Sequence, residues 1–75
     1  MIIYKKLWKL LIDKEIKKTE LSEKAKVSMT SIAKLGRNEN VNTDILNKIC
    51  IALGCNVSDI MEVIPEEENI YVNED

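Results

Sequence analysis

The stretch KKTELSEKAKVSMTSIAKLGR, residues 17–37, decides how this chain folds. It holds two short helical patterns with only a few residues between them. The apolar positions of the two patterns, with Val27 at the corner, are Leu21, Ala25, Ile32 and Leu35. The residues left for the outside are mostly small, polar or basic: Ser28, Met29, Thr30, Ser31, Lys34 and Arg37. Two helices joined by a short turn, with such an outer face on the second, are typical of a unit that places a helix in a DNA groove.

The first helix of such a unit needs small residues, because the second helix crosses it closely. Ser22 and Ala25 meet this need. The inner face of the second helix must carry bulky aliphatic side chains, and its outer face must be short and polar near the N-terminus. The same pattern also fits a short-turn helix pair in any all-α domain, so the pattern alone leaves both interpretations open.

With 75 residues, the chain is predicted to form one domain with a small core. Apolar residues make up 45% and charged residues 32%, which is typical of a folded globular domain and not of a disordered chain. No apolar run approaches the ~20 residues that span a bilayer. The N-terminal MIIYKKLWKLLIDK alternates lysine with apolar residues, unlike a signal peptide. We therefore expect a cytoplasmic protein without a membrane partner.

Positive and negative charges are concentrated in different halves of the chain. Residues 1–37 carry ten Lys and Arg against four Asp and Glu, a net charge of +6. Residues 38–75 carry one Lys against nine Asp and Glu, a net charge of −8. This asymmetry favours a basic face for a polyanion, although a solvated surface with accidental segregation would give the same count.

Catalysis, metal binding and cofactor binding are not expected. The chain has no His, no Gly-rich loop, no carboxylate pair in apolar surroundings and no CxxC pair. For Cys50 and Cys55 we expect free thiols in a reducing cytosol, with a disulfide as the alternative.

Further helices are predicted over residues 3–14, 43–53 and 57–62. Gly36 is expected to end the helix that precedes it, and Pro65 to end the helical part. The first helix is amphipathic and could lie on a membrane surface, but the matching apolar stripes of the later helices favour a core-facing helix. The predicted core is Leu7, Leu11, Leu21, Ala25, Ile32, Leu35, Leu46, Ile49, Leu53 and Ile60. We predict a domain over residues 1–64 and an acidic tail over 65–75.

The segment TELSEKAKVSMTSIAKLGRNENVNTDILNKICIALGCNVSDIMEVI resembles the lambda repressor and Cro type of domain, often called the XRE family. The resemblance covers residues 4–64. It implies an all-α, compact five-helix DNA-binding domain and a sequence-specific transcriptional regulator of double-stranded DNA, with a recognition helix at about residues 28–36 in the major groove. The chain departs from the family pattern with Lys26 in place of a turn glycine, with Ser22 in place of alanine, and with Met29 where a polar base reader is common.

The resemblance also implies which residues contact DNA. Lys18 and Thr19 would hold a phosphate at the start of the first helix of the pair, and Arg37 and Asn38 would hold another after the second. The residues at or near base edges would be Ser28, Met29, Thr30 and Ser31, with Lys34 reaching a guanine or a phosphate.

Two further possibilities concern partners. One is a homodimer formed through the last two helices and the tail, with Ile64, Ile70, Tyr71 and Val72 as candidate contacts. The other is a function of a different class, in which the chain is a protein-interaction module such as an antitoxin or an antirepressor-like partner. Its acidic tail would then bind a basic protein.

Overall fold

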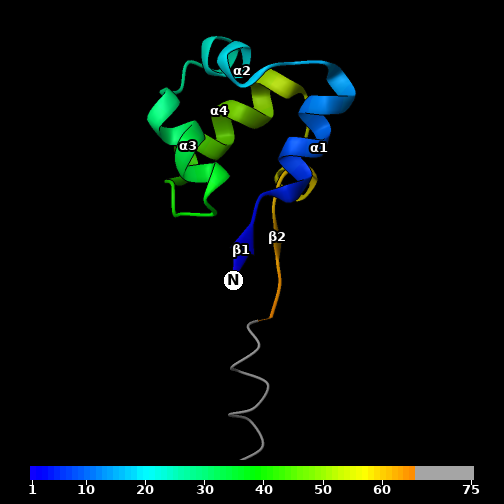
Figure 1. Cartoon of the computed structure of the whole chain (residues 1–75), viewed down its shortest axis with the longest axis vertical. Coiled ribbons are helices and arrows are strands. Elements are labelled where there is room, and N and C mark those ends of the chain that lie inside the picture. The colour runs from blue at the N-terminus through cyan, green and yellow to red at the C-terminus, as the bar shows by residue number, and fades with distance from the viewer. Residues whose placement is uncertain (66–75) are drawn as a thin grey trace, which may run out of the picture.

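The computed structural model describes residues 1–65, and this part of the chain folds into helices and a small antiparallel sheet. Figure 1 shows the helices gathered at one end of the molecule, with the two strands extending away from them. The elements are β1 (Ile2–Ile3), α1 (Lys5–Lys14), α2 (Lys18–Ala25), α3 (Met29–Gly36), α4 (Thr43–Leu53), the 3₁₀ turn η1 (Val57–Asp59) and β2 (Glu62–Val63). No helix in this part is long and apolar enough to cross a membrane.

The predicted helix pair is confirmed as α2 and α3, and each helix begins at a polar side chain. The carboxylate of Glu20 accepts a hydrogen bond from the backbone N–H of Lys17 at 2.8 Å, before the first turn of α2. The hydroxyl of Ser28 accepts one from the backbone N–H of Ser31 at 3.1 Å. Each side chain satisfies a backbone group that has no partner within its helix. The N-cap predicted for α4 is also present, because the Asn42 side chain accepts from the N–H of Ile45 at 3.0 Å.

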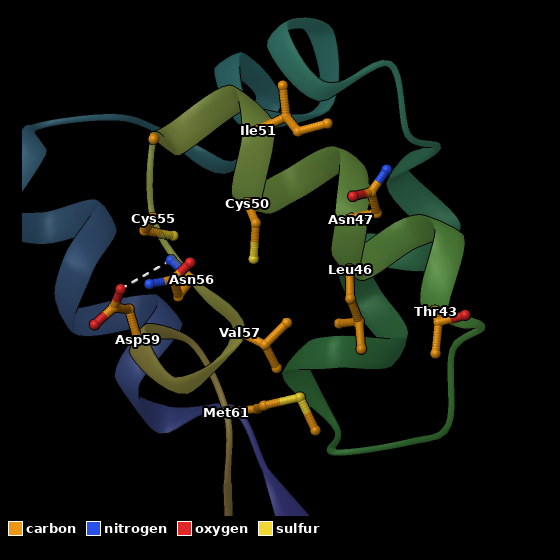
Figure 2. Close-up of a pocket in the computed structure, with 11 residues that line it drawn as sticks. Thr43, Leu46, Asn47, Cys50, Ile51, Cys55, Asn56, Val57, Asp59 and Met61 are labelled. Atoms are coloured by element: carbon orange, nitrogen blue, oxygen red, sulfur yellow. Dashed lines mark hydrogen bonds between the residues drawn. The ribbon is translucent and has the colours of Figure 1, made fainter.

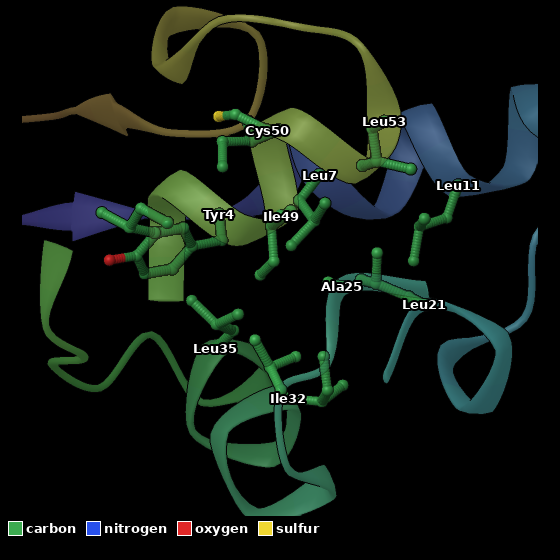
Figure 3. Close-up of a cluster of buried hydrophobic side chains, with 13 residues drawn as sticks. Tyr4, Leu7, Leu11, Leu21, Ala25, Ile32, Leu35, Ile49, Cys50 and Leu53 are labelled. Atoms are coloured by element: carbon green, nitrogen blue, oxygen red, sulfur yellow. The ribbon is translucent and has the colours of Figure 1, made fainter. Parts of the chain in front are cut away.

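The hydrophobic core lies between the helices, and Figure 3 shows its side chains converging from all four of them. All ten residues that the periodicity predicted for the core are buried. Helix α4 packs mainly against α2, so the helix pair is fixed to the rest of the domain through this contact. Three further apolar side chains are buried that the predicted core left out: Tyr4, Val27 and Cys50.

The described part of the chain is mostly helical with only a small sheet, as predicted, but the predicted count of five helices is not confirmed. The predicted helix over 57–62 is only the three-residue turn η1, and the next residues pair with the N-terminus as β2. Ile2 lies opposite Val63, and Ile3 lies opposite Glu62. The first helix therefore begins at Lys5 instead of residue 3. The β-branched residues after η1, followed by Pro65, favour an extended chain over a helix.

The prediction that α3 stops at Gly36 is confirmed, but Gly36 does not supply a left-handed turn. Gly36 is the last residue of the helix, and the left-handed residue beyond it is Asn38, with φ of 56°. Asparagine adopts this conformation more readily than most residues. The Asn38 side chain also accepts a hydrogen bond from the backbone N–H of Tyr4 at 3.0 Å, which ties the loop after α3 to the start of α1. The predicted contacts of Ile70, Tyr71 and Val72, and the acidic tail from residue 66 onward, lie outside the described residues.

Candidate nucleic-acid interface

The turn between α2 and α3 takes a left-handed backbone conformation at a lysine. Lys26 has φ of 58° and ψ of 46°, a region in which a residue with a Cβ is strained. Ser22 holds the turn from both of its oxygen atoms. Its carbonyl accepts from the N–H of Lys26 and of Val27, and its hydroxyl donates to the carbonyl of Val27 at 2.6 Å. The Ser22 hydroxyl thus supplies a bond across the turn that an alanine could not make.

Helix α3 is buried on one face and open on the other. Ile32 is 1% exposed and Leu35 is completely buried, so these two residues hold the helix on the core. Thr30 and Lys34 are exposed, and Met29 is 46% exposed at the start of the helix. A large apolar side chain in contact with water at this position is available to contact a ligand, such as the methyl group of a thymine.

The two serines predicted as base readers bond to each other. The Ser28 hydroxyl lies 3.1 Å from the Ser31 hydroxyl and 3.1 Å from the Ser31 backbone nitrogen. Ser31 is half-buried, whereas Ser28 is exposed. In this structure the pair therefore caps α3 and fixes its N-terminus. Met29 and Thr30 lie on the same turn of α3 but take no part in these two hydrogen bonds.

The start of α2 carries a lysine held over an aromatic ring. The Lys18 ammonium lies 4.6 Å from the centre of the Trp8 ring on α1, which is within the range of a cation–π interaction. Thr19 is exposed next to it, in the first turn of α2, where backbone N–H groups favour an anion. Trp8 and Lys18 belong to a shallow, mainly apolar hollow of about 490 Å³, whose remaining lining residues are Leu11, Ile12, Ile16, Lys17 and Thr19.

The two predicted phosphate contacts after α3 already have partners within the chain. The Arg37 guanidinium forms two hydrogen bonds to the Glu39 carboxylate, at 2.7 and 3.2 Å. This contact lowers the pKa of Glu39 and raises the pKa of Arg37, mainly through the side-chain hydrogen bonds. Lys34 adds a weaker attraction that also lowers the pKa of Glu39. The oxygen of Asn38 is bound to Tyr4, which leaves the amide nitrogen of that side chain outside this bond.

A second hollow lies between α4 and η1, and we call it the α4–η1 groove. Its volume is about 760 Å³, and Figure 2 shows side chains from both elements lining it. Two apolar residues at its edge are open to water, since Ile51 is 72% exposed and Val57 is 46% exposed. The other lining residues are Thr43, Leu46, Asn47, Cys50, Gly54, Cys55, Asn56, Asp59 and Met61.

Two residues at the candidate nucleic-acid interface around α2 and α3 were not predicted from the sequence. Trp8 was assigned only to the apolar stripe of the first helix, and its place under Lys18 depends on how α1 packs against α2. Glu39 was assigned to a polar loop. Its opposite charge two residues after Arg37 was the available signal, although such short-range pairs on a surface are common and weak.

Comparison with known proteins agrees with this geometry. A family model described as the Cro/C1-type HTH DNA-binding domain matches residues 6–66. The fold is similar to the crystal structure of the transcriptional regulator VanUg, Form II, with a TM-score of 0.81, 52% sequence identity and coverage of 87% of each chain. Among curated proteins, none matches. The resemblance noted in the sequence is thereby confirmed, and the chain belongs to the Cro/C1-type helix-turn-helix DNA-binding domain family.

Proposed function

We propose that this protein binds double-stranded DNA as a sequence-specific transcriptional regulator, with α3 inserted into the major groove. The observation that carries the proposal is the anchoring of α3. Ile32 and Leu35 fix one face of the helix to the core, while Thr30 and Lys34 remain open on the other. A helix presented in this way can approach base edges without loss of the core contacts.

Two roles are proposed for the residues near the start of α3. Met29 and Thr30 are the candidates for direct contact with bases near the start of α3, and Lys34 reaches further along the same face toward a guanine or a phosphate. Ser28 and Ser31 cap the helix. Their hydroxyls can also contact DNA, provided that the bond between them is kept or replaced.

Phosphate contacts are proposed on either side of this surface. Lys18 and Thr19 lie at the start of α2, where the ammonium and the helix N-terminus attract the same anion. After α3, Arg37 would have to exchange Glu39 for a phosphate or contact both, and Asn38 would donate from its amide nitrogen. These contacts position the protein on DNA but do not distinguish sequences.

We further propose that the protein acts as a homodimer in the cytoplasm, without a cofactor. One recognition helix as short as α3 offers few base contacts, and a two-fold dimer doubles them at half-sites about one helical turn apart. The α4–η1 groove is the candidate contact, since it has an exposed apolar edge at Ile51 and Val57 and is lined by no residue of α2 or α3. The tail beyond residue 65 is a second candidate.

Selection of bound sequences from a random duplex pool tests the proposal. We expect a palindromic product, and we expect affinity for it to fall steeply between two salt concentrations, because binding to phosphates releases counterions. No enrichment, together with no duplex binding at low salt, would contradict DNA binding. That result would favour the protein-interaction module, with a basic protein as the partner of the acidic tail.

A further inference from the structure

The C-terminus of α4 brings two thiols together that DNA binding does not use. Gly54 ends the helix with φ of 66°. The N–H of Cys55 donates to the carbonyl of Cys50 at 3.0 Å, and the N–H of Gly54 donates to the carbonyl of Ile51 at 3.3 Å. These two bonds define a Schellman motif, in which the side chains at the positions of Cys50 and Cys55 commonly contact each other.

The surroundings of the two thiols differ. Cys50 is 8% exposed and packs in the core, whereas Cys55 is half-buried. Both line the α4–η1 groove, and Figure 2 shows their side chains on the same wall of it. Burial raises the pKa of the Cys50 thiol to about 11, with further contributions from Cys55 and from the charge of Asp59. Cys50 is therefore protonated at neutral pH, and Cys55 is the thiol that a dissolved reagent meets first.

Metal binding at this position lacks ligands. No group of three Cys, His, Asp or Glu side chains in residues 1–65 is arranged to hold a metal ion. The carboxylate of Asp59, whose charge acts on Cys50, accepts a hydrogen bond from the backbone N–H of Asn56 at 2.9 Å. The chemistry left to the pair is oxidation.

We propose that Cys50 and Cys55 form a site of oxidative modification, at which a peroxide closes a disulfide across the end of α4. The Cys55 thiol loses its proton, the thiolate attacks one peroxide oxygen and the O–O bond breaks, so that Cys55 becomes a sulfenic acid. The departing hydroxide takes up the proton that Cys55 lost and leaves as one water. The Cys50 sulfur then attacks the Cys55 sulfur, and the S–O bond breaks. The departing hydroxide takes up the Cys50 proton and leaves as a second water. In balance, two thiols and one hydrogen peroxide give one disulfide and two waters, and the two thiols lose two electrons to the peroxide.

The bond would convert a hydrogen-bonded helix end into a covalent one. The closed loop runs only from Cys50 to Cys55, so the entropic stabilisation is near the low end for disulfides. The loop also forms one wall of the α4–η1 groove, so oxidation would fix the shape of that wall. The inference does not depend on DNA binding, because neither thiol lies on α2 or α3.

Oxidation of the full-length reduced protein with a small excess of hydrogen peroxide tests the proposal. We expect the intact mass to fall by two hydrogen atoms, both thiols to become unreactive toward an alkylating reagent at the same rate, and a proteolytic map to link Cys50 to Cys55 within one chain. The Cys55→Ser variant serves as the matched control, because it keeps the buried thiol and should lose the fast reaction with peroxide. Formation of the bond only between chains, or loss of one thiol without the other, would overturn the proposal.

The melting temperature of the oxidised protein shows whether the disulfide is compatible with the folded structure or requires the end of α4 to unfold. The oxidised protein should melt at a higher temperature than the reduced protein, and the difference should disappear on addition of a reducing agent. A lower melting temperature after oxidation would show that the bond forces the helix end out of its structure, and would also overturn the proposal.

Discussion

Helices α1, α2 and α4 each end on a left-handed residue, and the corners after α2 and α4, 28 residues apart from Lys26 to Gly54, are both followed by a buried isoleucine. Helix α2 ends on Lys26 with φ of 58°, and α4 ends on Gly54 with φ of 66°. Two residues later each corner has a polar residue at an N-cap position, Ser28 in the first and Asn56 in the second. Of these two corners, one is made by glycine, which adopts the turn without strain, and the other by lysine, which does not.

The two corners lead into different elements. Each is anchored four residues after the N-cap by a buried isoleucine, Ile32 at 1% and Ile60 at 0% exposure. The first continues as the helix α3, whereas the second stops after η1 and enters β2. A backbone corner with an isoleucine anchor is thus compatible with either continuation. The residues that follow the isoleucine therefore decide whether the chain continues as a helix with one solvent-exposed face, as in α3, or as a strand, as in β2.

The largest expected effect is the loss of either anchor. Ile32→Ala and Ile60→Ala should each lower the free energy of unfolding by ~2–5 kcal/mol, because truncation leaves a cavity in a packed core. Urea denaturation measures this. Ile12→Ala is the matched control, since Ile12 is 74% exposed, and it should change the free energy by less than ~0.5 kcal/mol. If Ile60→Ala behaves like Ile12→Ala, the two corners are not equivalent in their anchoring.

The second effect concerns DNA binding, which we assign to the residues around the first corner alone. Thr30→Ala or Lys34→Ala should weaken specific DNA binding by ~1–3 kcal/mol and relax the preference at one or two base pairs. Lys18→Ala should weaken binding to all sequences alike and reduce the salt slope by about one unit. Fluorescence anisotropy with selected and scrambled duplexes measures both.

Lys48→Ala is the control for these DNA measurements. Lys48 lies on α4 and pairs with Asp44 at 3.1 Å, so its loss should leave specificity unchanged. Identical behaviour of Lys34→Ala and Lys18→Ala would contradict the division into base and phosphate contacts.

A third effect concerns the bond that only the first corner has. Ser22→Ala removes the hydroxyl that donates to the Val27 carbonyl and should destabilise the protein by ~1 kcal/mol. Thermal or chemical denaturation measures the loss. Ser58→Ala provides the comparison, because Ser58 is exposed in η1 of the second corner. Equal effects of the two substitutions would mean that the Ser22 bond does not support the lysine turn.

A fourth effect should have opposite signs at the two corners. Lys26→Gly relieves the left-handed strain and should stabilise the protein by ~0.5 kcal/mol, after the entropy that glycine adds to the unfolded state. Gly54→Ala introduces the strain, with φ of 66°, and should destabilise by ~1 kcal/mol even though the added Cβ would meet no atom within 4 Å. Two changes of the same sign in the measured free energy of unfolding would show that φ alone does not set the stability of these turns.

The smallest effect concerns the carboxylate that holds Arg37. Glu39→Gln should release the guanidinium for DNA and tighten binding to all duplexes about two- to fivefold, in keeping with the weak energy of an exposed ion pair. Asp44→Asn, which removes the partner of Lys48 on α4, is the matched change of charge. If both variants tighten binding equally, the gain comes from net charge and not from Arg37.

The apolar spacing in the sequence was sufficient to predict α2, α3 and α4, because the pattern that buries one face of a helix is local. The polar residue before each apolar pattern also predicted the helix caps at Ser28 and Asn42. The strand β1 could not be predicted in this way, since Ile2–Ile3 continue the apolar pattern of α1 and their partners lie at Glu62–Val63. The bond between Asn38 and Tyr4 could not be predicted either, because it joins residues far apart in the sequence.

At the candidate interface, local signals predicted which side chains are exposed but not how they are held. Thr30 and Lys34 are exposed, as their place opposite the apolar positions predicted. The partners of Lys18 and Arg37 required the packing of α1 and the path of the loop after α3. Contact of any of these residues with DNA remains a prediction.

The short sheet also determines how the domain responds to tension. The ammonium of Met1 donates to the carbonyl of Ile64 at 2.9 Å, and the N–H of Ile64 donates to the carbonyl of Met1 at 2.8 Å, so the outer ends of β1 and β2 lie side by side. A force that pulls these ends apart acts along the hydrogen bonds between the strands and breaks them one after another, starting at the outer ends. The sheet should therefore open at low force and transfer the load to the bond between Asn38 and Tyr4, while the helices that hold α3 stay folded.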